Sequence, residues 1–225
     1  MGNDNSPSTV RTGHGSLRAK IVLIDPARPE PAFSRCREVV RSGGLLVYPT
    51  DTFYALGADP NNPAAVSRLF EVKSRQAGQP ILLLVQDARE VAHWAAEITP
   101  QAEGLMKKYW PGPLTLVFKA KPGVLPELTA GTGTIGIRVP GNELTRQLLA
   151  SLGTALTGTS ANLSGGHSPQ TAEQAMDAIG SLVDCVFDGG MTAGGKPSTI
   201  VDVSSGAPKL IREGAISSSK LMGSW

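Results

Sequence analysis

Several polar segments of the chain carry residue types that could bind and align a charged substrate. The first runs from Tyr48 to Gly57 and places the hydroxyls of Thr50 and Thr52 and the carboxylate of Asp51 directly after a predicted buried strand. Ligand crevices in open αβ sheets lie at such strand ends. Asp and Thr also act as local caps in ordinary turns. This segment therefore indicates a site only in combination with others.

Two closely spaced cations form the second segment. Lys73 and Arg75 flank Ser74, and Gln79 follows a few residues later. Paired cations suit a polyphosphate, which carries several negative charges within a short distance. Such pairs are more often a solvated helix end. Both interpretations stay open for this segment alone.

Arg138 is a single cation within the apolar strand predicted for residues 135–139. A buried guanidinium requires an anionic partner, because an uncompensated charge is costly to remove from water. That partner is either a ligand carboxylate or phosphate, or an acidic side chain of the protein itself. The sequence leaves these two alternatives equal.

Two loops rich in hydroxyls, amides and glycines complete the set. The residues from Thr157 to Pro169 follow a short strand and could surround phosphates or a ribose with hydrogen-bond donors. Gly195 to Asp202 forms a similar segment, and Ile211 to Gly214 adds a second arginine, Arg212. Either loop alone could be plain connecting structure.

Two glycine-rich stretches resemble nucleotide motifs but have the wrong context. The residues from Gly131 to Gly136 match G-x-G-x-x-G, yet they open a predicted strand rather than the helix that would meet a pyrophosphate. Gly190 to Lys196 nearly matches a P-loop, but Pro197 stands where Ser or Thr would hold magnesium. Both are predicted to be turns that can approach a ligand closely.

Metal-ion and nucleophilic chemistry have little support in the sequence. The three histidines lack ligand spacing, and we expect no protein metal site. Cys36 and Cys185 both lie in apolar patterns and are predicted to be buried structural thiols rather than a disulfide. The sequence shows no G-x-S-x-G elbow.

Length and composition favour one globular domain. The chain has 225 residues, of which 40% are hydrophobic, and a net charge of +2. That charge is too small to favour nucleic acid as the main partner. No apolar run approaches the ~20 residues that a membrane span requires, and the polar N-terminus does not resemble a signal peptide. We expect a disordered tail over residues 1–19, a catalytic domain over 20–216, a C-terminal tail over 217–225 and a cytoplasmic location.

Short apolar runs alternate with helical patterns, which indicates an αβ domain with a mixed sheet. Helices are predicted around residues 33–40, 66–70, 99–109, 144–149 and 171–179, with Thr99 as a cap before Pro100 and Gly43 as a stop. Uninterrupted apolar strands of this kind are typically covered on both faces. The predicted strands are Ile21–Ile24, Leu45–Tyr48, Ile81–Val85, Leu114–Phe118, Ile135–Val139, Ala155–Thr157, Cys185–Phe187, Thr199–Val203 and Lys209–Ile211.

Taken in order, the five segments resemble those of the YrdC-like family of threonylcarbamoyl-AMP synthases, in its short, single-domain form. The resemblance covers about residues 21–216. It implies an α+β fold with a twisted mixed sheet and flanking helices around a deep basic cavity. It also implies a nucleotidyltransferase that joins L-threonine, bicarbonate and ATP into threonylcarbamoyl-AMP and pyrophosphate. Partner proteins would then transfer the threonylcarbamoyl group to tRNA.

The resemblance also assigns individual residues. It places Thr52, Gly158 and Ser198 at the threonine together with Arg138, and it gives Lys73 and Arg75 a catalytic role at the phosphates. An Arg138 guanidinium could bind the threonine carboxylate as a fork. The resemblance implies magnesium bound with ATP. Around the ATP it places Lys73, Arg75, Gln79, Thr134, Ser160, Asn162, Ser168 and Arg212.

Some positions depart from the family pattern, and two other functions remain open. Ala55, Ser74 and Gln76 replace residues common in the family, and Leu84 stands where some members place a histidine near threonine. One alternative is an RNA-binding or ribosome-maturation protein that uses the same cavity. Another is carbamoyl-adenylate chemistry as in hydrogenase maturation. With a net charge of +2, we expect at most weak direct RNA binding.

Overall fold

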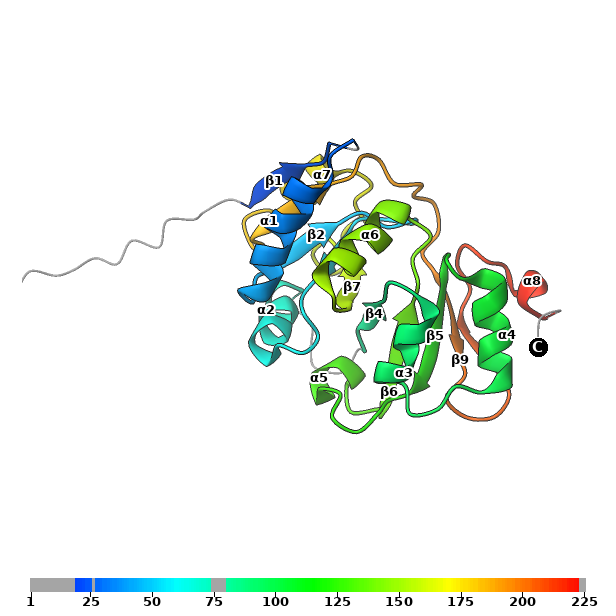
Figure 1. The fold of residues 1–225 in the computed structure, drawn as a ribbon. Helices are drawn as coiled ribbons and strands as arrows, with labels where there is room; N and C mark the ends of the chain where they lie inside the picture. The colour runs from blue at the N-terminus through cyan, green and yellow to red at the C-terminus, as the bar shows by residue number, and fades with distance from the viewer. Residues whose placement is uncertain (1–18, 26, 74–79, 223–225) are drawn as a thin grey trace, which may run out of the picture.

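A ten-stranded mixed sheet organises the chain in the computed structural model, which describes residues 19–25, 27–73 and 80–222 (Figure 1). The strand order across the sheet is β1-β8-β2-β3-β7-β4-β6-β5-β9-β10, with parallel and antiparallel neighbours. The strands are β1 (Lys20–Leu23), β2 (Leu46–Tyr48), β3 (Ala55–Gly57), β4 (Leu82–Leu84), β5 (Leu114–Lys119), β6 (Thr134–Arg138), β7 (Leu156–Ser160), β8 (Cys185–Asp188), β9 (Thr199–Asp202) and β10 (Lys209–Arg212).

Each of the nine predicted strands is present, and the mixed sheet is confirmed. β3 was not predicted, because its three residues, Ala-Leu-Gly, carry almost no β-propensity of their own. Its pairing with β2 and β7 makes it a strand. The glycine-rich stretch at residues 131–136 runs into β6, the one at residues 190–196 precedes β9, and neither opens a helix, as expected.

The predicted helices are also present, and their ends have the expected chemistry. The Thr99 hydroxyl accepts a hydrogen bond from the Ala102 amide, which caps α4 ahead of Pro100. Gly43, with a φ of 79°, follows the end of α1 in a conformation that favours glycine. The helices are α1 (Glu30–Arg41), α2 (Pro63–Lys73), the 3₁₀-helix η1 (Ala88–Glu90), α3 (Val91–Trp94), α4 (Pro100–Tyr109), α5 (Pro126–Thr129), α6 (Glu143–Leu152), α7 (Ala172–Ile179) and α8 (Ser218–Met222).

Both predicted tail boundaries need correction. The C-terminal tail predicted for residues 217–225 contains α8, because Leu221 is fully buried in the core and the Lys220 carbonyl accepts a hydrogen bond from the Tyr109 hydroxyl. A single buried leucine in a polar stretch leaves no periodic signal in the sequence. At the other end, Ala19 is buried, and its amide donates to the Gly180 carbonyl. Residues 1–18 lie outside the described part of the chain.

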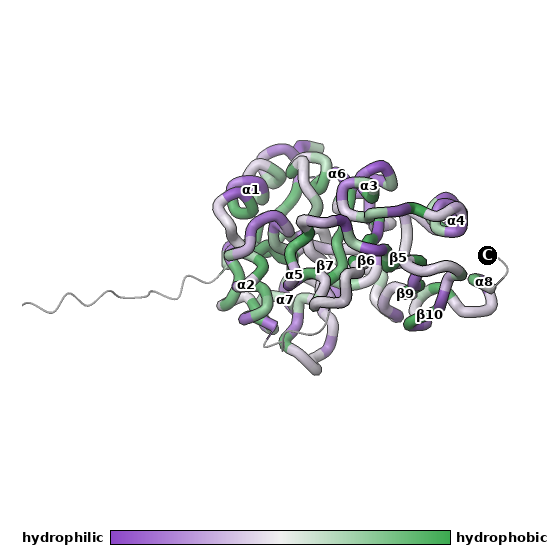
Figure 2. Tube along the Cα trace, turned by 90° about the horizontal axis from the view of Figure 1, so that it is seen from below, coloured by the Kyte–Doolittle hydropathy of each residue, from purple (hydrophilic) through white to green (hydrophobic). Residues whose placement is uncertain are grey.

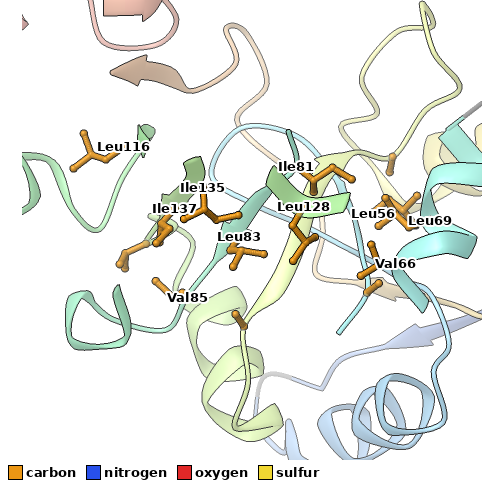
Figure 3. Packing of buried hydrophobic residues seen from close by; sticks show 14 of the residues in the cluster. Leu56, Val66, Leu69, Ile81, Leu83, Val85, Leu116, Leu128, Ile135 and Ile137 are labelled. Carbon is orange, nitrogen blue, oxygen red and sulfur yellow. The ribbon is translucent and has the colours of Figure 1, made fainter. Parts of the chain in front are cut away.

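Helices cover both faces of the sheet and enclose two hydrophobic clusters. On one face, α1 and α6 pack against β2, β8 and Leu156 of β7. On the other, α2, α4, α5 and α7 enclose the larger cluster, which includes Leu83, Ile137 and Leu116 (Figure 3). Figure 2 shows hydrophobic residues of β5, β6 and β7 running through the middle of the molecule. Coverage on both faces explains why these strands are nearly continuous apolar runs.

The two cysteines belong to the smaller of these clusters. Cys36 lies on α1 and Cys185 on β8, and both are buried and free of a disulfide. A hydrogen bond to Cys185 and burial together raise the pKa of the Cys36 thiol. A buried thiol with a raised pKa is a poor nucleophile. The prediction that both cysteines are buried and not joined in a disulfide is confirmed.

Candidate active site

One face of the central strands forms the floor of the candidate site. Side chains alternate between the two faces of a strand, so Arg138, Gly136 and Thr134 of β6 lie on the same face. Gly158 of β7 lies opposite Leu82 of β4 on that face. A Cβ atom at Gly158 would lie 2.9 Å from the Leu82 side chain, and one at Gly136 would lie 3.3 Å from it. A side chain at either position would crowd Leu82, whose own side chain packs over both glycines.

Ser198 and Arg212 reach the same face from the neighbouring strands. Arg212 pairs with Ile200 in the register of β9 and β10, and Ser198 is two residues before Ile200. The Arg212 Nη2 donates to the Ser198 carbonyl at 2.8 Å. The buried Ser198 hydroxyl in turn lies 2.9 Å from the hydroxyl of Thr115 on β5. These contacts fix both predicted site residues against the sheet.

Arg212 carries a positive charge that the described residues leave without a carboxylate partner. None of the ion pairs in the described part of the chain includes it. Burial and the nearby charge of Arg138 lower the pKa of the Arg212 guanidinium. Arg212 is exposed, and a cation that lies beside a second cation attracts an anion. This part of the site is therefore suited to an anionic ligand.

Arg138 has its own acidic partner within the protein. Its Nη2 lies 2.5 Å from Oδ1 of Asp51, and its Nε donates to the Gly112 carbonyl at 2.9 Å. The third guanidinium nitrogen, Nη1, lies 3.5 Å from the hydroxyl of Thr52, which is itself buried. The structure thus confirms internal pairing for Arg138. It also brings Thr52 and Arg138 together, as the resemblance implied.

Lys73 lies at the end of α2 and is almost fully buried, with an exposed fraction of 3%. Its Nζ donates to the Ser160 carbonyl at 2.7 Å, to the Asn162 carbonyl at 2.5 Å and to the Asn162 side-chain oxygen at 3.0 Å. The Ser160 hydroxyl donates to that same side-chain oxygen at 2.5 Å. The ammonium has three N–H groups, so these acceptors engage all of them. Lys73 therefore holds the loop after β7 in place.

A cleft of about 900 Å³ adjoins this loop. Asn162 and Ser168, two of the predicted nucleotide residues, line it together with Phe53, Gly195 and Pro197. Neither Arg138 nor Arg212 is among its lining residues. The described residues of this lining include no lysine or arginine, so the deep basic cavity that the resemblance implied remains a prediction.

The remaining predicted residues occupy varied positions. Arg75 and Gln79 lie outside the described residues. Thr134 lies on the same face as Arg138 but at the opposite end of β6, about 13 Å away at roughly 3.3 Å per residue. Leu84 is buried against Gly158, so no polar side chain takes the place of the histidine found in some family members.

The sequence did not identify Thr115 and Gly112, which the structure places at the site, and it gave no partner for Asp51. Thr115 contacts Ser198, Gly112 accepts from Arg138, and Asp51 pairs with Arg138 across 87 positions in the chain. Asp51 lies within the segment from Tyr48 to Gly57, but its partner could not be read from local spacing. Thr115 appeared only as one residue of an apolar strand.

The chain is similar to a known family of proteins. The model of the Sua5/YciO/YrdC family, described as "Telomere recombination", matches residues 38–214. The chain belongs to this family. A threonylcarbamoyl-AMP synthase of Thiobacillus denitrificans is 39% identical over 173 residues, which cover 77% of this chain and 90% of that protein. One of Pyrococcus abyssi is 36% identical over 177 residues, which cover 79% of this chain and 52% of that protein.

Solved structures agree with this assignment. The P. abyssi Sua5 protein in complex with L-threonine superimposes with a TM-score of 0.87 at 32% identity, covering 91% of this chain and 60% of that one. The family fold predicted from the sequence is therefore confirmed. The chain spans about half of the length of the P. abyssi synthase and nearly all of the T. denitrificans protein. Among the described residues, no helix is long and apolar enough to cross a membrane.

Proposed function

We propose that this chain is an L-threonylcarbamoyladenylate synthase. It would form threonylcarbamoyl-AMP and pyrophosphate from L-threonine, bicarbonate or CO₂, and ATP, as a nucleotidyltransferase. Relatives named threonylcarbamoyl-AMP synthase support the activity, and the P. abyssi complex supports threonine as substrate. One observation carries the proposal: four polar side chains lie close together on one face of the sheet. They are Arg138, Thr52, Ser198 and Arg212.

Threonine fits the part of the site around Arg138. The guanidinium would bind its carboxylate, and the buried hydroxyls of Thr52 and Ser198 would bind its polar groups. The Gly158 backbone would form the wall beside it. The threonine amine would add to CO₂ to give a carbamate and release a proton, or would condense with bicarbonate to give the same carbamate and release water. One carbamate oxygen would then attack the α-phosphorus of ATP, and the bond to the pyrophosphate leaving group would break.

ATP fits the part of the site around the loop after β7. Ser160, Asn162 and Ser168 line or adjoin the 900 Å³ cleft, and Thr134 extends the same face by about 13 Å at roughly 3.3 Å per residue. Because Lys73 already donates to three protein oxygens, we assign it the ordering of this loop and a favourable positive charge. Direct contacts with the departing pyrophosphate would come from Arg75, Gln79 and Arg212.

Such a reaction depends on alignment and charge stabilisation more than on a dedicated base. Mg²⁺ would be bound by the triphosphate itself, since it usually takes phosphate oxygens and few protein carboxylates. The protein groups fit this arrangement, because the carboxylate of Asp51 is already paired with Arg138 and need not bind the metal. The metal would neutralise phosphate charge during the transfer.

The product would pass to tRNA threonylcarbamoyl-transfer proteins, and a cytoplasmic location suits that role. The alternative of an RNA-binding or ribosome-maturation protein is not favoured by the relatives, which carry an enzyme's name. It predicts tight and salt-sensitive RNA binding without turnover. Carbamoyl-adenylate chemistry predicts use of carbamoyl phosphate.

One assay tests the proposal directly. The protein is incubated with ATP, Mg²⁺, L-threonine and ¹⁴C-bicarbonate, and the nucleotide products are separated. We expect labelled threonylcarbamoyl-AMP, with pyrophosphate release that requires threonine and bicarbonate together. Equal release with serine, or without any amino acid, would contradict the proposal. Turnover of carbamoyl phosphate in place of bicarbonate would support the related activity instead.

A further inference from the structure

The contacts of Arg138 leave one side of its guanidinium group for a ligand. A guanidinium has two edges that can each donate two parallel hydrogen bonds, one formed by Nε and Nη2 and the other by Nη1 and Nη2. Nε donates to the Gly112 carbonyl at 2.9 Å, and Nη2 lies 2.5 Å from Asp51 Oδ1. The first edge is therefore occupied by the protein. Nη1 and Nη2 carry two N–H groups each, and the contacts with Thr52 at 3.5 Å and with Asp51 use one of each. The second edge is therefore the one that can offer two bonds to an incoming carboxylate.

We propose that Asp51 is a positioning residue for the threonine site, which acts by holding Arg138 so that its Nη1–Nη2 edge faces the substrate carboxylate. This inference rests on the proposed function. Asp51 itself need not touch the substrate, because its Oδ1 contact already fixes the direction of the guanidinium plane. The Gly112 carbonyl fixes the plane at a second point.

The Asp51 carboxylate is itself held in place. A Cβ atom at Gly141 would lie 2.9 Å from Oδ2 and 3.1 Å from Cγ of Asp51, so the backbone at Gly141 packs directly against the carboxylate. Gly141 comes three residues after Arg138, just past the end of β6. The chain that presents the arginine therefore also confines its acidic partner. The side-chain exposed fractions, 4% for Arg138 and 17% for Asp51, are small enough that little water competes for the pair.

Asp51 also balances charge within the site. Arg138 and Arg212 lie close enough that the Arg138 charge lowers the pKa of Arg212. With Asp51 in place, the pair with Arg138 is neutral overall, and Arg212 contributes the net positive charge. Without Asp51, two uncompensated cations would face each other, and Arg138 could turn toward water or toward the phosphates. The expected consequence is a loss of threonine recognition rather than of ATP binding.

A double-mutant cycle tests this inference. The variants are Asp51→Ala, Arg138→Ala and the two combined, each assayed with varied threonine at saturating ATP and then with varied ATP. We expect Asp51→Ala to lower kcat/KM for threonine by about 10–100-fold while KM for ATP stays within about twofold. In the Arg138→Ala background, adding Asp51→Ala should change kcat/KM for threonine by less than about twofold, because Asp51 has lost the group through which it acts.

Conservative and matched variants complete the design. Asp51→Asn keeps an oxygen that can accept from Nη2 but removes the negative charge, so it should lower kcat/KM for threonine by less than Asp51→Ala does. It replaces Asp51→Ala in the cycle if that variant does not fold. Glu38→Ala removes the acidic partner of Arg35 on the surface of α1, where the pair distance is 2.7 Å, and should leave both KM values unchanged. The inference would be overturned if the reductions in kcat/KM for threonine multiplied in the double variant. Equal reductions in kcat/KM for ATP and for threonine would overturn it as well. Failure of the proposed function would appear separately, as a wild-type protein that forms no labelled adenylate.

Discussion

The substitution Lys73→Met tests whether the buried lysine supports the structure as well as the chemistry. Methionine keeps much of the apolar stem but has no donor. It would leave the carbonyls of Ser160 and Asn162 and the Asn162 side-chain oxygen without the bonds of 2.7, 2.5 and 3.0 Å that Nζ now makes. Hydrogen bonds that involve a charged group contribute about 1.5–3 kcal/mol each, and their loss is partly offset by relaxation of the loop.

We therefore expect Lys73→Met to lower the free energy of unfolding by about 2–4 kcal/mol. For a chain of this size, each kcal/mol shifts Tm by about 2–4 °C, so Tm should fall by about 4–16 °C. Lysine 73 has an exposed fraction of only 3%, so solvent screening does not reduce this value much. Thermal and urea unfolding followed by circular dichroism would measure both quantities.

The matched control is Lys107→Met, at a lysine whose side chain is 81% exposed and whose nearest carboxylate, Glu103, is 3.9 Å away. Its unfolding free energy should stay within about 0.5 kcal/mol of the wild type. If Lys73→Met is as stable as this control but fails to form the adenylate, Lys73 acts on the substrate alone. The assignment of a loop-ordering role would then be wrong.

Three further variants have distinct expected outcomes. Arg138→Lys keeps the charge but cannot donate two parallel hydrogen bonds. Calorimetry should therefore show a loss of about 1.5–3 kcal/mol in the binding free energy of threonine and nearly none for a non-hydrolysable ATP analogue. A less stable variant with unchanged threonine affinity would mean that Arg138 serves only its ion pair. Gly57→Ala would place a Cβ atom 2.5 Å from the Tyr48 ring. Urea denaturation should therefore show a free energy of unfolding lower by about 1–3 kcal/mol. A variant as stable as the wild type would contradict this close packing. Thr99→Ala removes the cap that accepts from the Ala102 amide and should cost about 1 kcal/mol in unfolding free energy, whereas no loss would mean that the cap is dispensable.

Local sequence patterns were sufficient for much of the fold. Apolar runs marked strands such as β5 and β6, and the cap at Thr99 and the stop at Gly43 marked helix ends, because each depends on residues close together in the chain. The order of five weak motifs was enough to indicate the family. None of these signals depends on which strands become neighbours.

The same patterns could not reveal elements that tertiary packing creates. β3 exists because β2 and β7 lie on either side of Ala55–Gly57, and α8 exists because Leu221 is buried in the core. In each case the stabilising contacts come from residues distant in the sequence. A short segment has too few residues of its own to show a helical or strand period.

For the site, the sequence by itself determined the residue types, and the tertiary structure decided their partners. It identified Arg138 as a cation in need of an anion, but only the fold brought Asp51 to it across 87 positions. It left Lys73 as either a phosphate ligand or part of a solvated helix end, whereas the fold places its ammonium among oxygens of residues 87 and 89 positions away. The physical reason is that a buried charge needs hydrogen-bond or ionic partners within about 3 Å. Strand register and loop packing determine which groups lie there, and local spacing in the sequence does not.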